Sequence, residues 1–206
     1  MKVYEFAGLP NPTRVRIALA EKGLTNEVEF ISVDVPGGEH RKPEFLTKNP
    51  SGAVPVLELD CGTTIAECTA ITEYLDHLTG DPSLTGRTPK ERAVIHMMQR
   101  RAEAGLLDAV GAYFHHATPG LGPEIETYQC AEWGNHQYER AVAGMHYLDG
   151  VLADHPYLAG AKFSMADITA FAGMAFANFA QVPIPDSCTN LQAWQDRIAE
   201  RPSVAG

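Results

Sequence analysis

The sequence predicts an α/β domain followed by an all-helical domain. Alternation of apolar and polar residues, typical of strands, occurs before about residue 80, whereas apolar residues recur at three-and-four spacing from Pro82 onward. Between the two patterns, Pro, Gly, Ser and Thr cluster from Gly80 to Pro89, as in a linker. The chain has 206 residues, 45% of them apolar, which is enough for two small domains with cores of their own. We expect one domain over residues 1–82 and a second over residues 89–206.

The first half is predicted to contain a strand, a helix, a second strand, a hairpin and a second helix. Asn11 is a favourable N-cap for the first helix, Pro12 a favourable first helical residue, and Gly23 a stop signal. Asp60, Cys61 and Gly62 form the turn of the hairpin. The expected ranges are Lys2–Phe6, Asn11–Lys22, Glu27–Val33, Val54–Leu59 with Thr64–Ile65, and Glu67–Leu78.

The second half is predicted to be helical throughout. Breaks are expected at Pro119-Gly120, at Pro156 and at Pro183 to Pro185. A serine with an acidic residue three positions later, Ser164 and Asp167, predicts a capping box with a structural role. The expected helices are Pro89–Ala117, Glu124–Ala153, Met165–Asn178 and Leu191–Glu200.

Composition excludes several classes of partner. Sixteen Lys and Arg against 26 Asp and Glu give a net charge of −10, which disfavours nucleic acid and anionic membranes. No stretch approaches the ~20 apolar residues that span a bilayer, and the start of the chain lacks the pattern of a signal peptide, so we expect a cytoplasmic protein. The cysteines lack CxxC or metal-type spacing, and we expect reduced thiols and no metal: Cys61, Cys68, Cys130 and Cys188.

The order of elements and four motifs resemble the soluble glutathione transferases, in particular a bacterial and fungal subgroup that lacks the usual catalytic tyrosine. The motifs are PNPTRVRIALAEKGL at Pro10–Leu24, KPEFLTKNPSGAVPVLELD at Lys42–Asp60, IAECTAITEYLD at Ile65–Asp76 and SMADIT at Ser164–Thr169. The resemblance implies a thioredoxin-like N-terminal domain that binds glutathione and an all-helical C-terminal domain that holds a hydrophobic electrophile. It further implies a detoxifying transferase that uses glutathione as co-substrate, requires no metal and forms a homodimer, with the helix that opens at Pro89 contributing to the contact.

The same resemblance implies which residues contact glutathione. Val54 would offer its backbone to the cysteinyl unit, with Pro55 in the cis form, although a plain turn proline is the alternative. Glu67 would take the γ-glutamyl ammonium. Cys68 replaces the usual serine, so the backbone N–H there would carry more of the contact with the γ-glutamyl carboxylate. His40 would reach the glycine carboxylate or, alternatively, lie solvated in a surface loop.

The reaction requires the thiolate of glutathione, because an ordinary thiol with a pKa of about 8.5 is only slightly ionised at neutral pH. Lowering that pKa by two units requires about 2.7 kcal/mol. A helix N-terminus supplies ~0.3–1 kcal/mol, at best ~2, and one charge-assisted hydrogen bond ~1.5–3 kcal/mol, so a helix and one donor together suffice.

The identity of that donor is open. No serine precedes Ser32 and no cysteine precedes Cys61, and Pro10 occupies the register of the usual serine or cysteine. Tyr4 lies within the predicted strand, which favours core packing. Asn11 remains, either as a donor to sulfur or as an N-cap through its oxygen, and Thr13 is a weaker candidate.

A second route to the thiolate lies near the end of the predicted helix Pro89–Ala117. In the subgroup resembled here a histidine holds a water that accepts the thiol proton, and His115 matches it. Its expected hydroxyl partner four positions earlier is replaced by Gly111. The adjacent His116 points about 100° away and is expected at the surface. Tyr113 is a candidate for the electrophile pocket.

Two further functions remain open at this level. One is glutathione-dependent reduction of disulfides, and the other is non-catalytic ligand binding by a protein that has kept the fold. Residue spacing does not identify the electrophile.

Overall fold

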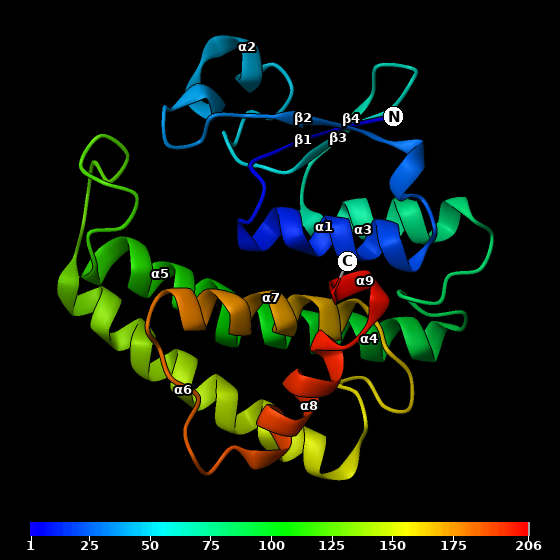
Figure 1. Ribbon diagram of the computed structural model, residues 1–206, viewed down its shortest axis with the longest axis vertical. Coiled ribbons are helices and arrows are strands. Elements are labelled where there is room, and N and C mark those ends of the chain that lie inside the picture. The colour runs from blue at the N-terminus through cyan, green and yellow to red at the C-terminus, as the bar shows by residue number, and fades with distance from the viewer. Residues whose placement is uncertain (206) are drawn as a thin grey trace. The chain divides into compact units, whose positions relative to one another are not determined.

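The computed structural model describes residues 1–205, and its contacts divide the chain into two compact units, Met1–Leu84 and Thr85–Gly206. The first unit combines a sheet with helices, and the second consists of helices, as the residue patterns predict (Figure 1). Each unit has its own buried apolar cluster. Gly206 lies outside the described residues.

The first unit is built on a four-stranded sheet with the order β2-β1-β3-β4. Strand β1 (Lys2–Glu5) pairs in parallel with β2 (Glu29–Ser32) and antiparallel with β3 (Val56–Glu58). Strand β4 (Thr64–Ile65) pairs antiparallel with β3, so the predicted hairpin is confirmed. Alternation along β1 sends Val3 to one face and Tyr4 to the other, which gives the sheet two apolar faces.

Two helices, α1 (Pro10–Glu21) and α3 (Cys68–Leu78), lie side by side on one face of the sheet (Figure 1). Their apolar stripes bury Val15, Leu19, Ile71 and Leu75 against Val3 and Leu57. The far ends of the two helices are joined by a buried ion pair of 2.8 Å between Lys22 Nζ and Asp76 Oδ1. On the other face of the sheet, Phe45 of the short helix α2 (Pro43–Leu46) packs with Val33 and Val56.

The start of α1 differs from the prediction. The helix begins at Pro10, and Leu9 is its N-cap, whereas Asn11 was expected there. The Leu9 carbonyl accepts the Thr13 N–H at 3.1 Å and the Thr13 hydroxyl at 2.9 Å, which starts the helix two residues early. Proline fits this first turn because its missing N–H would have no partner within the helix. Asn11 is therefore a residue of the helix itself.

Strand β1 and helix α3 lie close to the positions expected for them, but β2 is shorter than predicted. A 3₁₀ turn occupies Thr25–Glu27, so the strand begins at Glu29. A second 3₁₀ turn at Glu39–Arg41 precedes α2. This second turn carries His40, one of the predicted binding residues.

The second unit is a bundle of helices. One long run follows the linker and consists of α4 (Pro89–Ala102), a π-helical turn (Glu103–Leu107) and α5 (Asp108–Ala117), where a single helix was expected. The others are α6 (Ala131–Asp154), α7 (Met165–Phe179), α8 (Thr189–Ala199) and the short α9 (Pro202–Ala205). Helix α7 packs against α4, α5 and the π-helical turn. It is buried along most of its length because it lies at the centre of the bundle (Figure 1).

Glycines allow the helices of the bundle to approach closely. A Cβ added at Gly144 of α6 would lie 2.2 Å from the carbonyl oxygen of Gly105 in the π-helical turn. A Cβ at Gly134 would lie 2.7 Å from the Cβ of Ala117 at the end of α5. Real side-chain atoms do not fit such distances, so glycine at both positions sets the spacing of α6 from the preceding run.

The predicted capping box is confirmed at the start of α7. The Ser164 side chain accepts a hydrogen bond from the Ala166 N–H, and Asp167 accepts the Ser164 N–H at 3.0 Å. Asp167 also accepts the Leu158 N–H and the Trp194 Nε1–H, at 3.0 and 3.1 Å. The box therefore has the structural role expected of it and joins α7 to α8.

The described part of the chain holds no helix that is long and apolar enough to cross a membrane. Within residues 1–205, no three His, Cys, Asp or Glu side chains are grouped in a way that could hold a metal ion.

Candidate functional site

The Val54–Pro55 peptide bond is cis, as the resemblance implies. It directly precedes strand β3, whose first residue is Val56. The segment that leads to it lies against the 3₁₀ turn of His40, since a Cβ at Gly52 would be 3.2 Å from the His40 carbonyl oxygen. Two of the predicted glutathione-binding segments therefore meet within the first unit.

His40 is buried, with 7% of its surface exposed, so the alternative of a solvated loop histidine is wrong. Its Nδ1 has no hydrogen-bond partner within residues 1–205. Burial and the neighbouring charge of Arg41 lower the pKa of the imidazole below its ordinary value. His40 is thus a neutral side chain with an unsatisfied nitrogen, and a polar group of a bound ligand can satisfy it.

Glu67 stands at the N-cap of α3 with φ 67° and ψ 119°. A positive φ costs a residue with a Cβ of order 1–3 kcal/mol, and such residues cluster at functional sites. The helix begins here because the Glu67 carbonyl accepts the Ile71 N–H at 2.9 Å. The Glu67 carboxylate is exposed, and no hydrogen bond or ion pair joins it to another described residue. It is therefore available to a cationic group of a ligand.

Cys68, the first residue of α3, is buried, and its thiol donates to the backbone carbonyl oxygen of Asn11 at 3.4 Å. The contact brings the first turns of α1 and α3 together. Because the thiol is used in this way, a ligand carboxylate at the start of α3 would depend on backbone N–H groups, which have no acceptor inside a first helical turn.

Asn11 is exposed in the first turn of α1, and its Oδ1 accepts a hydrogen bond of 3.0 Å from Arg14 Nη1. Its oxygen does not cap the helix, so the N-cap interpretation of Asn11 is wrong. No other described residue forms a hydrogen bond with its Nδ2 amide group. Asn11 thus presents two N–H donors beside a helix N-terminus.

The other early hydroxyl groups already have partners. Tyr4 donates to Glu58 Oε2 at 3.0 Å, and Lys48 bonds the same carboxylate at 2.6 Å. These contacts lower the pKa of Glu58 and raise that of Lys48. The Thr13 hydroxyl donates to the Leu9 carbonyl. Tyr4 therefore packs in the apolar cluster on one face of the sheet, as predicted, and Thr13 does not offer a donor to a ligand.

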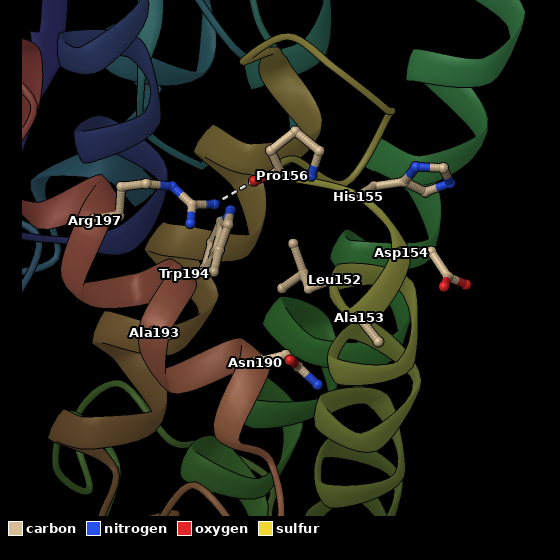
Figure 2. Close-up of a pocket in the computed structure, with 9 residues that line it drawn as sticks. All are labelled: Leu152, Ala153, Asp154, His155, Pro156, Asn190, Ala193, Trp194 and Arg197. Atoms are coloured by element: carbon tan, nitrogen blue, oxygen red, sulfur yellow. Dashed lines mark hydrogen bonds between the residues drawn. The ribbon is translucent and has the colours of Figure 1, made fainter.

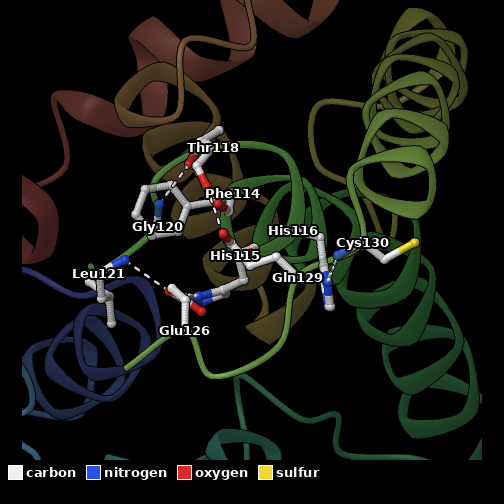
Figure 3. Close-up of polar contacts among 9 residues, drawn as sticks. All are labelled: Phe114, His115, His116, Thr118, Gly120, Leu121, Glu126, Gln129 and Cys130. Atoms are coloured by element: carbon white, nitrogen blue, oxygen red, sulfur yellow. Dashed lines mark hydrogen bonds and ion pairs between the residues drawn. The ribbon is translucent and has the colours of Figure 1, made fainter. Parts of the chain in front are cut away.

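In the second unit, His115 is paired with the carboxylate of Glu126, a partner that no sequence motif indicates. His115 Nδ1 lies 2.7 Å from Glu126 Oε1, and the two side chains point toward one another in Figure 3. The Leu121 N–H donates to the same oxygen at 2.8 Å. A carboxylate at Nδ1 places the proton of the neutral imidazole there and leaves Nε2 as an acceptor.

Neighbouring contacts of Gln129 and His116 explain why α6 begins at Ala131 and not near Glu124 as predicted. Gln129 Nε2 donates to the carbonyl oxygens of His115 and Thr118, at 2.7 and 2.8 Å. His116 Nδ1 accepts the Cys130 N–H at 3.2 Å, which ties the end of α5 to the start of α6 (Figure 3). His116 therefore has a structural role. Only the Pro119-Gly120 break signalled this loop, and helical periodicity did not show where it ended.

One aromatic ring, that of Phe114, contacts His115 and joins it to a cluster of phenylalanines. Tyr113, the predicted pocket residue, is half-buried with its ring edge-on to Tyr138 at 5.2 Å, and thus belongs to the packing of α5 on α6. Phe114 lies 5.1 Å from the His115 ring and 5.4 and 5.6 Å from Phe176 and Phe179. Phe179 is 69% exposed. These phenylalanines form an apolar surface beside His115. No sequence motif indicates this surface, because its residues come from two helices, α5 and α7, that are distant in the chain.

The second unit also has a pocket of about 340 Å³ between the end of α6 and α8 (Figure 2). Three of its polar side chains are bonded to other groups of the protein. Arg197 donates to the Pro156 carbonyl, Asn190 to Asp149, and Trp194 to Asp167. These bonds hold α8 in the bundle.

Comparison with known proteins agrees with the resemblance. Residues 10–78 match the family model of the glutathione S-transferase N-terminal domain, and residues 139–202 match that of the C-terminal domain. Glutathione S-transferase 2 of Saccharomyces cerevisiae is 59% identical over 204 residues, covering 99% of this chain and 88% of that protein. The crystal structure of Gtt2 from Saccharomyces cerevisiae superposes with a TM-score of 0.98 at 58% identity, covering 100% of this chain and 99% of that chain.

A second crystal structure, of a glutathione S-transferase domain-containing protein from Marinobacter aquaeolei VT8, also has a TM-score of 0.98, at 62% identity, with 99% of this chain and 100% of that chain covered. The predicted thioredoxin-like unit followed by an all-helical unit is thereby confirmed. The chain belongs to the glutathione S-transferase family of enzymes.

Proposed function

We propose that this protein binds glutathione in its first unit and transfers the thiolate to carbon of a hydrophobic electrophile, as a detoxifying transferase of the cytoplasm. Glutathione is the substrate that enzymes of this family share. The observation that carries the proposal is the amide of Asn11, whose Nδ2 group has no partner among the described residues and lies in the first turn of α1.

The remaining glutathione contacts follow from the groups left available in the same unit. The carboxylate of Glu67 takes the γ-glutamyl ammonium, and the backbone at the start of α3, beginning with Cys68, takes the γ-glutamyl carboxylate. Val54 offers its backbone to the cysteinyl unit beside Pro55. His40 donates from its unsatisfied Nδ1 to the glycine carboxylate. These five residues hold the peptide, and Asn11 contacts its sulfur.

The stabilisation needed at sulfur agrees with this arrangement. A pKa lowered by two units requires about 2.7 kcal/mol. The N-terminus of α1 contributes about 0.3–1 kcal/mol and a hydrogen bond from Asn11 to the charged sulfur about 1.5–3 kcal/mol, so the two together reach that value. No ionisable donor is required. The thiolate then attacks the electrophilic carbon and forms the carbon–sulfur bond while the leaving group departs with its electron pair.

His115 supports a second contribution, the removal of the thiol proton. Glu126 orients the imidazole so that Nε2 accepts, and a water held there would receive the proton and pass it on. Gly111 does not supply the hydroxyl expected in the subgroup. The apolar surface formed by Phe114, Phe176 and Phe179 favours hydrophobic electrophiles, and we propose that Tyr113 of the same helix α5 contributes to their pocket.

The test of the function combines binding and turnover. Glu67→Gln should weaken glutathione binding about 10- to 100-fold by calorimetry, because a charge-assisted hydrogen bond of about 1.5–3 kcal/mol is lost. Glu73→Gln, on the same helix and beside His77, is the matched control and should bind normally. Unchanged affinity in Glu67→Gln would contradict the assignment of the γ-glutamyl site.

Turnover separates the proposed reaction from the two other functions that the sequence allows. We expect conjugation of chlorodinitrobenzene by the unmodified protein. Reduction of bis(hydroxyethyl) disulfide without conjugation would instead identify a glutathione-dependent disulfide reductase. Absence of glutathione binding would identify a non-catalytic ligand-binding protein.

A further inference from the structure

Arg14 is a buried cation one helical turn after Asn11, with 4% of its surface exposed. Its guanidinium donates through Nη1 to Asn11 Oδ1 at 3.0 Å. Arginine is rarely buried unless its donors are used, and here one of them is spent on a side chain that reaches the protein surface. The pair thus links the interior of the first unit to the exposed first turn of α1.

The chemistry of the guanidinium determines which way the Asn11 amide faces. A guanidinium has five N–H donors and no acceptor, so only the oxygen of the amide can face it. The Nδ2 group must then point away from Arg14. Without Arg14 the amide would have no fixed orientation before glutathione binds, and turning its N–H toward the thiolate would offset part of the hydrogen bond.

A second contact holds the backbone of the same residue. The Cys68 thiol donates to the Asn11 carbonyl oxygen at 3.4 Å, so both oxygens of Asn11 accept hydrogen bonds. A donor to one end of an amide also polarises it and strengthens the donor at its other end. Arg14 therefore both orients the Nδ2 group and makes it a better donor.

We infer that Arg14 is a positioning residue for thiol activation, which acts by holding the Asn11 amide with its N–H donors toward the sulfur of glutathione. The inference rests on the proposed function. It assigns to Arg14 no contact with glutathione itself. It differs from a purely structural role because it predicts that the ionisation of the bound thiol depends on Arg14 through Asn11.

The test measures the pKa of glutathione bound to the full-length protein, from the thiolate absorbance near 240 nm as a function of pH. Asn11→Ala should raise this pKa by about one unit or more, the equivalent of the lost hydrogen bond to the charged sulfur. Arg14→Met, which keeps the length and packing of the side chain but removes the donor, should raise the pKa in the same direction. Arg14→Lys keeps a cationic donor and should restore most of the effect.

The double variant Asn11→Ala/Arg14→Met should have the pKa of Asn11→Ala alone, because Arg14 then has no amide to orient. Arg16→Met is the matched control. It removes another guanidinium of α1, one bonded to Glu5 at 3.0 Å, and should leave the thiol pKa unchanged even if stability falls. If Arg14→Met does not fold, Arg14→Gln replaces it, because a glutamine amide has both a donor and an acceptor and does not fix which end of the Asn11 amide faces it.

The outcomes separate the inference from the proposed function. A raised pKa in Asn11→Ala with an unchanged pKa in Arg14→Met overturns the role of Arg14 only. A further rise when Arg14→Met is added to Asn11→Ala also overturns it, since Arg14 would then act without Asn11. An unchanged pKa in Asn11→Ala contradicts Asn11 as the donor and the inference with it, whereas absence of bound glutathione contradicts the proposed function.

Discussion

The carboxyl group of Asp167 shows how burial and hydrogen bonding compete at one residue. The side chain is fully buried and accepts hydrogen bonds from Leu158, Ser164 and Trp194. These bonds favour the carboxylate, but removal from water opposes it more strongly and raises the pKa of Asp167 to about 6. The group therefore takes up a proton in the folded protein at a pH where it is ionised in the unfolded chain.

This raised pKa predicts a pH dependence of stability. A folded-state pKa above the unfolded value contributes stability that is fully present below about pH 4 and is lost as the pH rises through 6. The span from 3.8 to about 6 corresponds to at most about 3 kcal/mol. In urea titrations, the wild-type free energy of unfolding relative to Asp167→Asn should fall by an amount approaching this between pH 4 and 7. A constant difference between the two proteins would show that Asp167 ionises normally.

Among single residues, the sequence identified the set of candidates but not their partners. Glu67, His40 and Asn11 are predicted as site residues because their motifs are local in the sequence. Three hydrogen bonds could not be predicted from the sequence: Thr13 to the Leu9 carbonyl, Arg14 to Asn11, and His115 to Glu126. Each depends on the side-chain rotamer that packing allows.

The packing of helix α6 on the preceding run depends on glycine at one position and not at another. Gly144 faces the Gly105 carbonyl oxygen, where a Cβ would be only 2.2 Å away, so backbone would have to move to accept any side chain. Gly150, six residues later in the same helix, has no atom within 4 Å of such a Cβ. The two positions form a matched pair for testing close helix packing.

Gly144→Ala should destabilise the protein by about 1–3 kcal/mol or more, because overpacking forces the helices apart. Gly150→Ala should instead stabilise it by about 0.5–1 kcal/mol, as alanine favours the helix and fills open space. Urea unfolding of both variants measures the two effects. Equal effects at the two positions would show that the approach of α6 to the π-helical turn does not limit side-chain size.

Periodicity predicted the helices better than it predicted their ends. The run Pro89–Ala117 was expected to be one helix, whereas a π-helical turn at Glu103–Leu107 interrupts it. The start of α6 was predicted several residues early, because the loop before it is stabilised by side-chain bonds from Glu126 and Gln129 to backbone groups elsewhere. Such bonds leave no periodic pattern in the sequence.

For the molecule as a whole, we propose a two-fold dimer, the assembly that the family resemblance implies. Met97 of α4 and Tyr147 of α6 are both more than two-fifths exposed and line a groove of about 840 Å³ in the second unit. Arg101 bonds the Tyr147 hydroxyl at 2.6 Å and holds its ring in place. An exposed apolar surface of this kind on α4 suits contact with a second copy of the chain.

Sedimentation should therefore give a mass of about two 22.4 kDa chains. Met97→Glu should shift the mass toward one chain, since a buried unpaired carboxylate opposes association. Phe179→Glu, which changes an exposed aromatic residue of α7, is the control and should leave the mass unchanged. A single-chain mass for the unmodified protein, or an unchanged mass for Met97→Glu, would contradict this surface as the contact.

The order of strands and helices, the two-part organisation and the family follow from the amino-acid sequence, because periods of two and 3.6 residues and short motifs are properties of neighbouring residues. Folding alone brings together residues that are distant in the chain, such as Cys68 and Asn11, 57 positions apart. It also selects the face of the Asn11 amide and the carboxylate partner of His115. These choices depend on which donors and acceptors packing leaves within about 3 Å of one another, a distance that no local pattern encodes.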